Sequence, residues 1–249
     1  MFMRSGNATG TLVFTILSSL AGVACSSGGP SLPPHVVWAE LAVDTIDPDE
    51  NEYANTPSFI EWAGDNGAAQ TKNRSVCATF LTMLLTRSYN LTDPELSAWM
   101  GSTSPNAGLY HDAILAENGF QTIVIAPEIE IGDILAIKYP DGSASTGHVM
   151  VVTSPPVERA PTAPLVPGTT QYEVSIIDSS SSPHGPADTR ELGGGAFDTG
   201  VGEGTFRLYA DPAGNIVGHT WSTEATSTYY NQNERSLTVG RLVNIGSAL

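Results

Sequence analysis

The spacing of hydrophobic residues changes from a helical to a strand period near residue 120. Before that point, Cys77, Phe80, Leu81, Leu84 and Leu85 recur at i, i+3, i+4, i+7 and i+8, which predicts a helix from about residue 75 to residue 88. Three further helices are expected: a short one over 57–67 ending at a glycine, one in "TDPELSAWMG" with Asp93 as its N-cap, and one in "NAGLYHDAILAENGF".

After residue 120 the chain reads as strands separated by turn signals such as "PDG" and "DPAG". Helices followed by an antiparallel-looking sheet indicate an α+β fold. Residues 155–168 are rich in proline and are expected to form a surface insert between two strands. The predicted strands are 121–126, 133–139, 148–154, 172–178, 204–210, 215–221 and 236–242.

The first residues have the order of a secretory signal peptide. Arg4 precedes a short apolar run over 11–24, which is too short for a permanent membrane anchor. "GVAC" resembles the bacterial lipobox, so 1–24 is expected to be a signal peptide and Cys25 a lipidation site. Residues 25–54 are expected to form a Ser/Gly/Pro tether and acidic linker, and 55–249 a single domain with a C-terminal strand extension. The protein is thus expected to be exported and held at a bacterial cell envelope by its lipid, or else to be secreted or periplasmic.

Charge narrows the range of partners. The chain has 26 acidic and 10 basic residues, for a formal net charge of −16. Such a surface repels nucleic acid and anionic lipid headgroups. No P-loop, dinucleotide-binding fingerprint or Cys/His metal-ligand spacing occurs, so no cofactor or metal is expected.

Cys77 is placed where a nucleophile would be effective. It falls in the first turn of its predicted helix, where unpaired backbone N–H groups and the helix dipole stabilise a thiolate. The same N–H groups could stabilise an oxyanion next to the sulfur. Two other interpretations stay open: a buried structural cysteine, and a disulfide between Cys25 and Cys77.

Two polar residues on the predicted strands favour the catalytic interpretation. His148 opens one strand and shares a face with Met150 and Val152. Asp178 ends the next strand, where it continues an apolar stripe and so needs a hydrogen-bond donor. A cysteine, a histidine and an aspartate in this order would supply a nucleophile, a base and a residue that orients the base.

The order of a cysteine at a helix start, then "GDILAI", "GHVMVV" and "IID", resembles the NlpC/P60 and CHAP group of papain-like cysteine peptidases and amidases. The resemblance covers residues 55–180 approximately and implies helices packed on an antiparallel sheet. It places Cys77 on the nucleophile, His148 on the general base and Asp178 on the third member. The chain departs from the family in having "VCAT" where "DCSG" is usual, and in its long insert.

Several other residues are candidates for the site. Gln70 and Asn73 are the amide side chains close enough upstream to assist the Cys77 N–H in an oxyanion hole. His184 could orient the base, line the cleft, or be an ordinary loop residue. Arg190, with Asp188, could bind a substrate carboxylate or form an ion pair, and Trp221 could form a wall of the cleft.

Together these features predict an exported thiol hydrolase that cleaves peptide or amide bonds, with cell-wall peptides as the substrate that the resemblance implies. Two alternatives remain. The chain could be a surface lipoprotein that uses the fold for envelope binding without turnover, or a thiol acyltransferase, which shares the first half-reaction.

Overall fold

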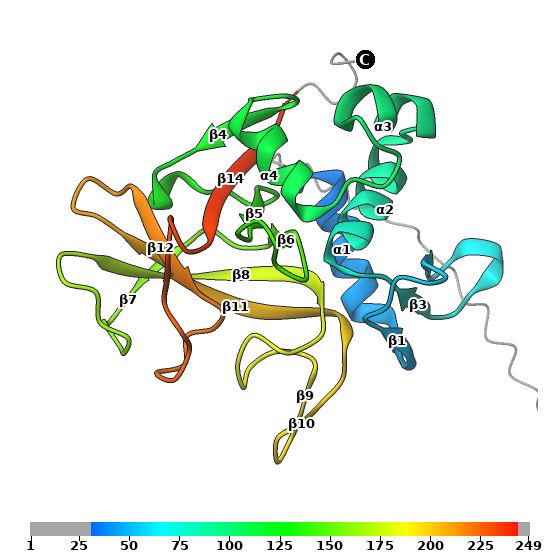
Figure 1. Cartoon of the computed structure of the whole chain (residues 1–249). Coiled ribbons are helices and arrows are strands. Elements are labelled where there is room, and N and C mark those ends of the chain that lie inside the picture. The colour runs from blue at the N-terminus through cyan, green and yellow to red at the C-terminus, as the bar shows by residue number, and fades with distance from the viewer. Residues whose placement is uncertain (1–30, 244–249) are drawn as a thin grey trace, which may run out of the picture. The chain divides into compact units, whose positions relative to one another are not determined.

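The computed structural model describes residues 31–243, and residues from Leu32 onward form one compact unit. Within the described residues the fold is α+β, with four α-helices and sheets whose strands are mostly antiparallel (Figure 1). The helices are α1 (Pro34–Thr45), α2 (Cys77–Tyr89), α3 (Asp93–Met100) and α4 (Ala107–Leu115).

A nine-stranded antiparallel sheet has the order β13-β12-β11-β8-β6-β5-β14-β4, with β7 beside β8. The sheet curls so that the segment after β4 meets the start of β12. There the N–H of Ile216 donates to Val124 O at 3.0 Å, and Ile125 forms a β-bridge with Asn215. Its strands are β4 (Phe120–Ile123), β5 (Ile134–Lys138), β6 (Gly147–Val152), β7 (Val157–Arg159), β8 (Thr170–Ser180), β11 (Gly200–Ala210), β12 (Ile216–Thr220), β13 (Tyr230–Asn231) and β14 (Ser236–Leu242).

The C-terminal strands are integral to this sheet. β14 lies between β4 and β5, and β11 pairs with β8 along its whole length (Figure 1). A small hairpin of β9 (Glu191–Gly193) and β10 (Ala196–Phe197) separates β8 from β11. The predicted C-terminal extension therefore completes the sheet from within.

Two hydrophobic cores lie on the two faces of the sheet. One face of β5 and β6, with Ile134, Ala136, Val149 and Val151, packs against the apolar stripe of α2. The opposite face fills the interior of the curl, where Met150 and Val152 meet residues of β8 and β11. β5 and β6 are thus covered on both sides, which explains their nearly continuous apolar sequences. The first core fixes α2 against β6.

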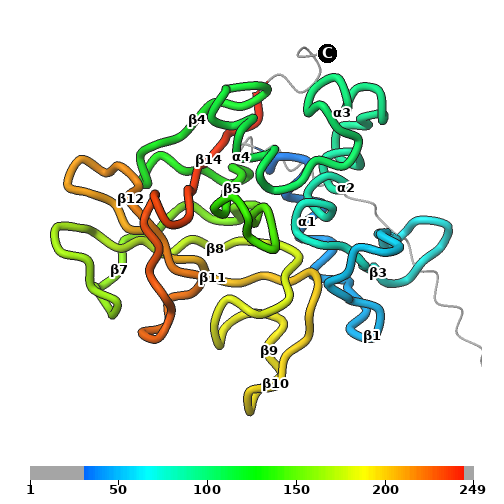
Figure 2. The backbone as a smooth tube through the Cα atoms, in the orientation of Figure 1, coloured from blue at the N-terminus to red at the C-terminus, as the bar shows by residue number. Residues whose placement is uncertain are grey.

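The N-terminal part of the domain differs from the prediction. Residues 34–52, expected to belong to a tether and linker, form α1 and β1 (Ile46–Glu52). α1 lies beside α2 in the backbone trace (Figure 2) and buries Val36, Ala39 and Ala42 completely. The tether prediction was wrong over this range because its composition is typical of a linker. The prolines before residue 35 instead begin α1, and the acidic run "IDPDENE" forms β1.

The predicted helix over 57–67 was also wrong. That segment forms β2 (Phe59–Glu61) and a 3-10 turn (Asp65–Gly67), and β2 pairs with β3 (Thr71–Arg74) next to β1. A second 3-10 turn spans Ala126–Glu128. The helices predicted further on are confirmed, although α3 is capped by Thr92, whose side chain and that of Glu95 form a capping box, and not by Asp93.

Candidate active site

α2 begins at Cys77 without a capping side chain. The N-cap residue, Val76, is extended and makes no side-chain cap, whereas Thr92 and Asn106 cap α3 and α4. The N–H groups of the first helical turn have no partners inside a helix. In α2 they therefore remain available to a negative charge at the sulfur. Within the described residues Cys77 is a free thiol, and it is only 4% exposed.

His148 is the second residue of β6, and the glycine before it makes its position possible. Gly147 has φ +148°, and a Cβ there would collide with the carbonyl oxygen of Ile137 on β5. The strand can therefore begin close against β5 only with glycine at 147. As expected, His148 shares a face with Met150 and Val152, and its ring lies at the rim of the inner core.

Asp178 lies near the end of β8 and is fully buried. Its Oδ2 accepts hydrogen bonds from Nε2 of His148 at 2.5 Å and from Nε2 of His184 at 2.8 Å. Its Oδ1 accepts from Nη1 of Arg190 at 2.8 Å. Since Nε2 of His148 is engaged by Asp178, Nδ1 is the nitrogen left for the thiol of Cys77. The structure thus brings together the three residues that the sequence predicted as nucleophile, base and orienter.

A second carboxylate stabilises this arrangement from behind. Asp188 accepts from Nε of Arg190 at 2.8 Å and from its Nη2 at 2.7 Å. Gly202 and Gly204 of β11 leave room for the pair, because a Cβ at either position would collide with the Arg190 or Asp188 side chain. Arg190 is 2% exposed, so the prediction that it binds a substrate carboxylate was wrong. Its two carboxylate partners are internal.

The charges in this cluster reinforce one another. Burial raises the pKa of Asp178, but the positive charges of Arg190 and His184 and the histidine hydrogen bonds outweigh burial and hold this pKa well below its usual value. Burial lowers the pKa of His148, yet the thiolate of Cys77 and the carboxylate of Asp178 raise it to about 10. Asp178 therefore stays ionised and His148 holds its proton at neutral pH.

The thiol of Cys77 is the acidic partner of this imidazolium. Burial raises the pKa of Cys77, but the charge and hydrogen bond of His148 and a hydrogen bond from the Val149 backbone lower it below the ordinary value. A thiolate–imidazolium pair is the form that attacks a carbonyl carbon. The backbone just before α2 is also held in place, because the Oγ of Ser179 on β8 donates a hydrogen bond to the carbonyl oxygen of Ser75 at 2.7 Å.

Tyr53 is a site residue that the sequence did not predict. It follows β1 directly, lines the cleft with His148, and lies close enough to Cys77 for the thiolate charge to act on its hydroxyl. Burial, with the charge of Cys77, raises the pKa of Tyr53, so the hydroxyl remains a donor. It was missed because residues 25–54 were taken as a linker, and the run "DENEY" has no period that would place its tyrosine beside a helix start.

The two side chains predicted as oxyanion donors are placed elsewhere. Gln70 is exposed in the turn before β3 and does not line the cleft. Asn73 is fully buried; its Nδ2 donates to Asn51 Oδ1 at 3.0 Å and its Oδ1 accepts from Ser75 Oγ at 2.5 Å. Asn73 thus joins β1 to the start of α2, and both oxyanion predictions were wrong.

His184 joins the cluster by its hydrogen bond to Asp178, and its ring lies beside that of His148 with centroids 6.2 Å apart. Besides the bond to Asp178, its Nδ1 donates to Trp221 O at 2.7 Å, and its N–H donates to Asp188 Oδ2 at 2.7 Å. The Trp221 ring meets the His148 ring edge-on, with centroids 5.2 Å apart. His184 and Trp221 therefore hold the base from two sides.

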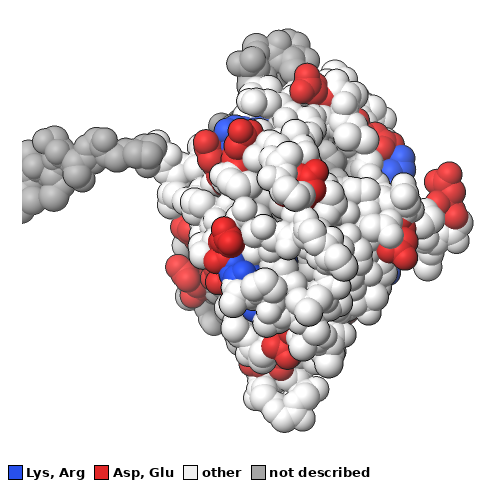
Figure 3. Space-filling model, turned by 90° about the vertical axis from the view of Figure 1, so that its left-hand side faces the viewer, with Lys and Arg blue, Asp and Glu red and all other residues white. Residues whose placement is uncertain are grey.

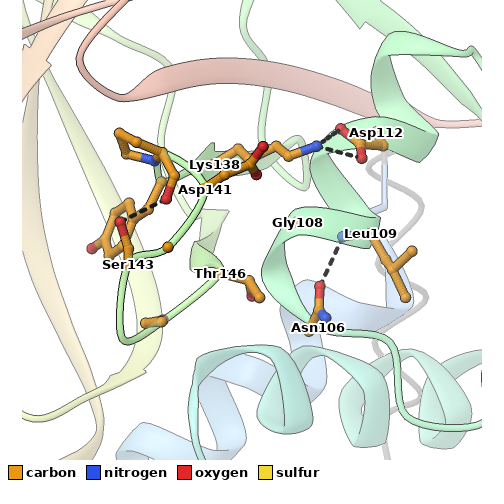
Figure 4. Close-up of a pocket in the computed structure, with 12 residues that line it drawn as sticks. Asn106, Gly108, Leu109, Asp112, Lys138, Asp141, Ser143 and Thr146 are labelled. Atoms are coloured by element: carbon orange, nitrogen blue, oxygen red, sulfur yellow. Dashed lines mark hydrogen bonds and ion pairs between the residues drawn. The ribbon is translucent and has the colours of Figure 1, made fainter.

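A cleft of about 410 Å³ opens over the base. Tyr53, His148, His184 and Trp221 line it together with Tyr139 and Ser180–Ser182, so its walls are aromatic and hydroxylic. A second hollow of about 230 Å³ adjoins it and shares Tyr139 and Ser145 (Figure 4). There the Lys138 ammonium is paired with Asp112 at 2.6 Å, so that hollow has no unpaired basic side chain. The two hollows together could receive an extended substrate.

The cluster of His148, Asp178 and His184 is better suited to hydrogen bonding among its own side chains than to binding a metal ion. His148, Asp178 and His184 offer ligand atoms within 4.8 Å of one another. However, Oδ2 of Asp178 is in direct hydrogen-bonding contact with both imidazoles, and the Arg190 cation lies 2.8 Å from Oδ1. A cation between these ligands would replace both bonds and face a neighbouring positive charge.

Comparison with known proteins finds a relative in a virus. The chain is 30% identical over 220 residues to the uncharacterized protein R653 of Acanthamoeba polyphaga mimivirus. The aligned region covers 84% of this chain and 96% of the viral protein. The chain belongs to the same family as this viral protein. No family model matches the chain, and no solved structure matches it. The family relationship itself carries no activity, so function has to be argued from the site.

Proposed function

We propose that the protein is a thiol hydrolase of the cysteine peptidase or amidase type, with a papain-like arrangement of its helices and sheet. The observation that carries the proposal is the meeting of Cys77, at the uncapped start of α2, with a base that a buried carboxylate orients. A structural cysteine would need neither a lowered pKa nor an ionised histidine beside it.

The proposed reaction follows from the placement of each group. The Cys77 thiolate attacks the carbonyl carbon of an amide, and the resulting oxyanion accepts from the Cys77 N–H and the Tyr53 hydroxyl. The His148 imidazolium gives its proton to the leaving amine as the C–N bond breaks, which leaves a thioester on Cys77. Neutral His148 then takes a proton from water, the hydroxide attacks the thioester, and the acid is released with the thiol restored.

The resemblance to NlpC/P60 and CHAP enzymes extends the proposal to peptide or amide bonds of the bacterial cell wall. Export would fit such a substrate, but Cys25 and the expected signal peptide over 1–24 lie outside the described residues. Among the residues that the structure describes, no helix is both long and apolar enough to cross a membrane.

The rate of iodoacetamide alkylation of Cys77 against pH tests the proposal, in a chain carrying Cys25→Ser so that one thiol is measured. An activated pair labels rapidly well below pH 8, and His148→Ala removes that fast labelling while the rate at high pH persists. Labelling only above about pH 8 in the parent chain would show an ordinary thiol.

Hydrolysis is then measured on cell-wall peptide fragments, with Cys77→Ala as the inactive variant. Its circular dichroism and melting temperature are expected to match those of the parent, because the substitution removes one sulfur atom. Turnover by Cys77→Ala equal to that of the parent would refute the proposed nucleophile.

A further inference from the structure

Arg235 lies in a box of aromatic rings, two of which are walls of the cleft, although Arg235 itself is not among the residues that line it. Its guanidinium carbon lies 3.8 Å from the ring centre of Tyr230, 4.6 Å from that of Tyr139 and 5.8 Å from that of Trp221. The side chain is half-buried. Through cation–π attraction these contacts hold the guanidinium carbon in one place relative to the rings.

The polar edge of this guanidinium has no partner among the described residues. The other basic side chains in that part of the chain each have an ion pair or hydrogen bond. In contrast, only the backbone N–H of Arg235 is bonded, to Asn231 O. The partnered side chains are Lys72, Arg74, Arg87, Lys138, Arg159, Arg190, Arg207 and Arg241.

The unpartnered state is unusual for a chain of this charge. With 26 acidic residues against 10 basic ones, carboxylates are abundant, and acidic side chains are scattered over the face shown in Figure 3. Even so, none lies within ion-pair distance of Arg235 in the described residues. Glu234 and Asp141 line a hollow beside Tyr139, but neither lines the cleft over His148.

Arg235 is close enough to the base to act on a bound substrate. Tyr139 and Trp221, two of the rings that hold it, are walls of the cleft. The Trp221 ring centre lies 5.2 Å from the His148 ring centre and 5.8 Å from the guanidinium carbon of Arg235. The distance from Arg235 to the His148 ring therefore cannot exceed the sum of these two distances. An extended peptide crosses such a span in at most about three residues.

None of the residues that line the cleft carries an unpaired permanent positive charge. Apart from His148 and His184, whose Nε2 atoms are bonded to Asp178, its lining consists of uncharged aromatic, hydroxyl and small side chains. A planar guanidinium stacked on rings keeps its N–H edge free, and that edge matches a carboxylate bidentately.

We propose that Arg235 binds a carboxylate of the substrate at the Tyr139–Trp221 end of the cleft. The preferred substrates are then amides or peptides that have an anionic group within about three residues of the bond that reacts. This inference rests on the proposed function, because it assigns a specificity-determining residue to the same site.

A matched series of thiol-reactive probes tests the inference without knowledge of the natural substrate. N-iodoacetyl peptides of one, two and three glycines are compared as free C-terminal carboxylates and as C-terminal amides, on the full chain carrying Cys25→Ser. The measured quantity is the ratio of the Cys77 alkylation rates of carboxylate and amide at each length. Because both probes of a pair react with the same thiol, a change in the reactivity of Cys77 alters both rates equally and leaves their ratio unchanged.

Arg235→Met is expected to lower the ratio about tenfold at the best length and to leave the amide rates within about twofold, since a charge-assisted hydrogen bond is lost. Arg235→Lys keeps the charge and is expected to retain part of the preference. Lys72→Met, which removes the same charge from an exposed pair with Glu50, is expected to leave every ratio unchanged. Melting temperatures show whether each variant is folded.

An equal ratio in the parent and Arg235→Met, with fast amide labelling in both, would overturn the role of Arg235 and leave the thiol hydrolase intact. A fall of similar size in Lys72→Met would also overturn it, by showing a general charge effect. Slow labelling of the parent by every probe at neutral pH would instead refute the activated thiol and this inference with it. If Arg235→Met is unfolded, Arg235→Lys and Lys72→Met are compared instead. Equal rates for the carboxylate and amide probes in both variants, at every length, overturn the inference.

Discussion

Arg190 donates to Oδ1 of Asp178 at 2.8 Å, on the side of the carboxylate opposite to the two imidazoles. Asp178 therefore has positive or donating groups on both oxygens, and Asp188 neutralises the remaining edge of the guanidinium. The base is thus held by a buried chain of alternating charges in which each member depends on the next.

Arg190→Met is expected to lower the free energy of unfolding by about 3–5 kcal/mol, because two buried carboxylates lose their common cation. Denaturant unfolding measures the change, with Lys72→Met as a matched loss of an exposed ion pair, which should cost no more than about 1 kcal/mol. Equal losses in the two variants would show that the buried network adds nothing to stability.

The pH profiles of two reactions of Cys77 are expected to separate at high pH. Acylation by an amide needs the His148 proton for the leaving amine, so its rate should fall as pH rises through about 10, the pKa of His148. Alkylation by iodoacetamide needs only the thiolate and should stay high there. Single-turnover rates measure both, and a parallel decline would mean that His148 is not the acid.

Tyr53→Phe is expected to reduce kcat about 10²–10³-fold if the hydroxyl stabilises the oxyanion, with a small change in KM. Alkylation has no oxyanion, so its rate at neutral pH should change far less. Tyr139→Phe, which removes a hydroxyl from another wall of the cleft, is the matched control. A drop in alkylation as large as the drop in kcat would assign Tyr53 to thiolate stabilisation alone.

His219 is expected to make the fold sensitive to acid. It is fully buried, neither ring nitrogen has a partner in the described part of the chain, and burial lowers its pKa to about 3. The unfolded state binds a proton near pH 6.5 and the folded state does not, so stability is lost as pH falls from about 6.5 towards 3.

His219→Phe should remove this contribution, since the ring already stacks on Phe206 with centroids 5.3 Å apart. Urea midpoints between pH 7 and pH 4 measure the effect: the parent should lose more stability than the variant. Identical pH slopes would show that the imidazole is protonated in the folded protein.

The α+β class and the positions of Cys77, His148 and Asp178 could be predicted from the sequence because local patterns encode them. The stripe on α2 gave the position of Cys77 within its first turn, and alternation in β6 and β8 gave the faces of His148 and Asp178. Each inference needed only the period of one element. The meeting of the three then followed from packing a helix on a sheet.

Residues whose roles depend on distant pairing could not be predicted. Tyr53 reaches the thiol only because β1 pairs in parallel with β3, and Arg190 turns inward only because Gly202 and Gly204 leave space on β11. In the sequence, the first looks like a linker residue and the second like a surface cation. Arg235 gave no signal either, because its three rings come from three different segments.

The uncapped start of α2 implies a trade between stability and activity. A side-chain cap adds about 1 kcal/mol to a helix, yet position 76 holds valine in a backbone conformation that suits a capping residue. Val76→Asp should therefore raise the melting temperature while its carboxylate occupies the first-turn N–H groups and slows alkylation of Cys77 at neutral pH. If both stability and reactivity rise, the open helix end serves no catalytic purpose. If they move in opposite directions, selection has kept this helix less stable than its sequence would allow.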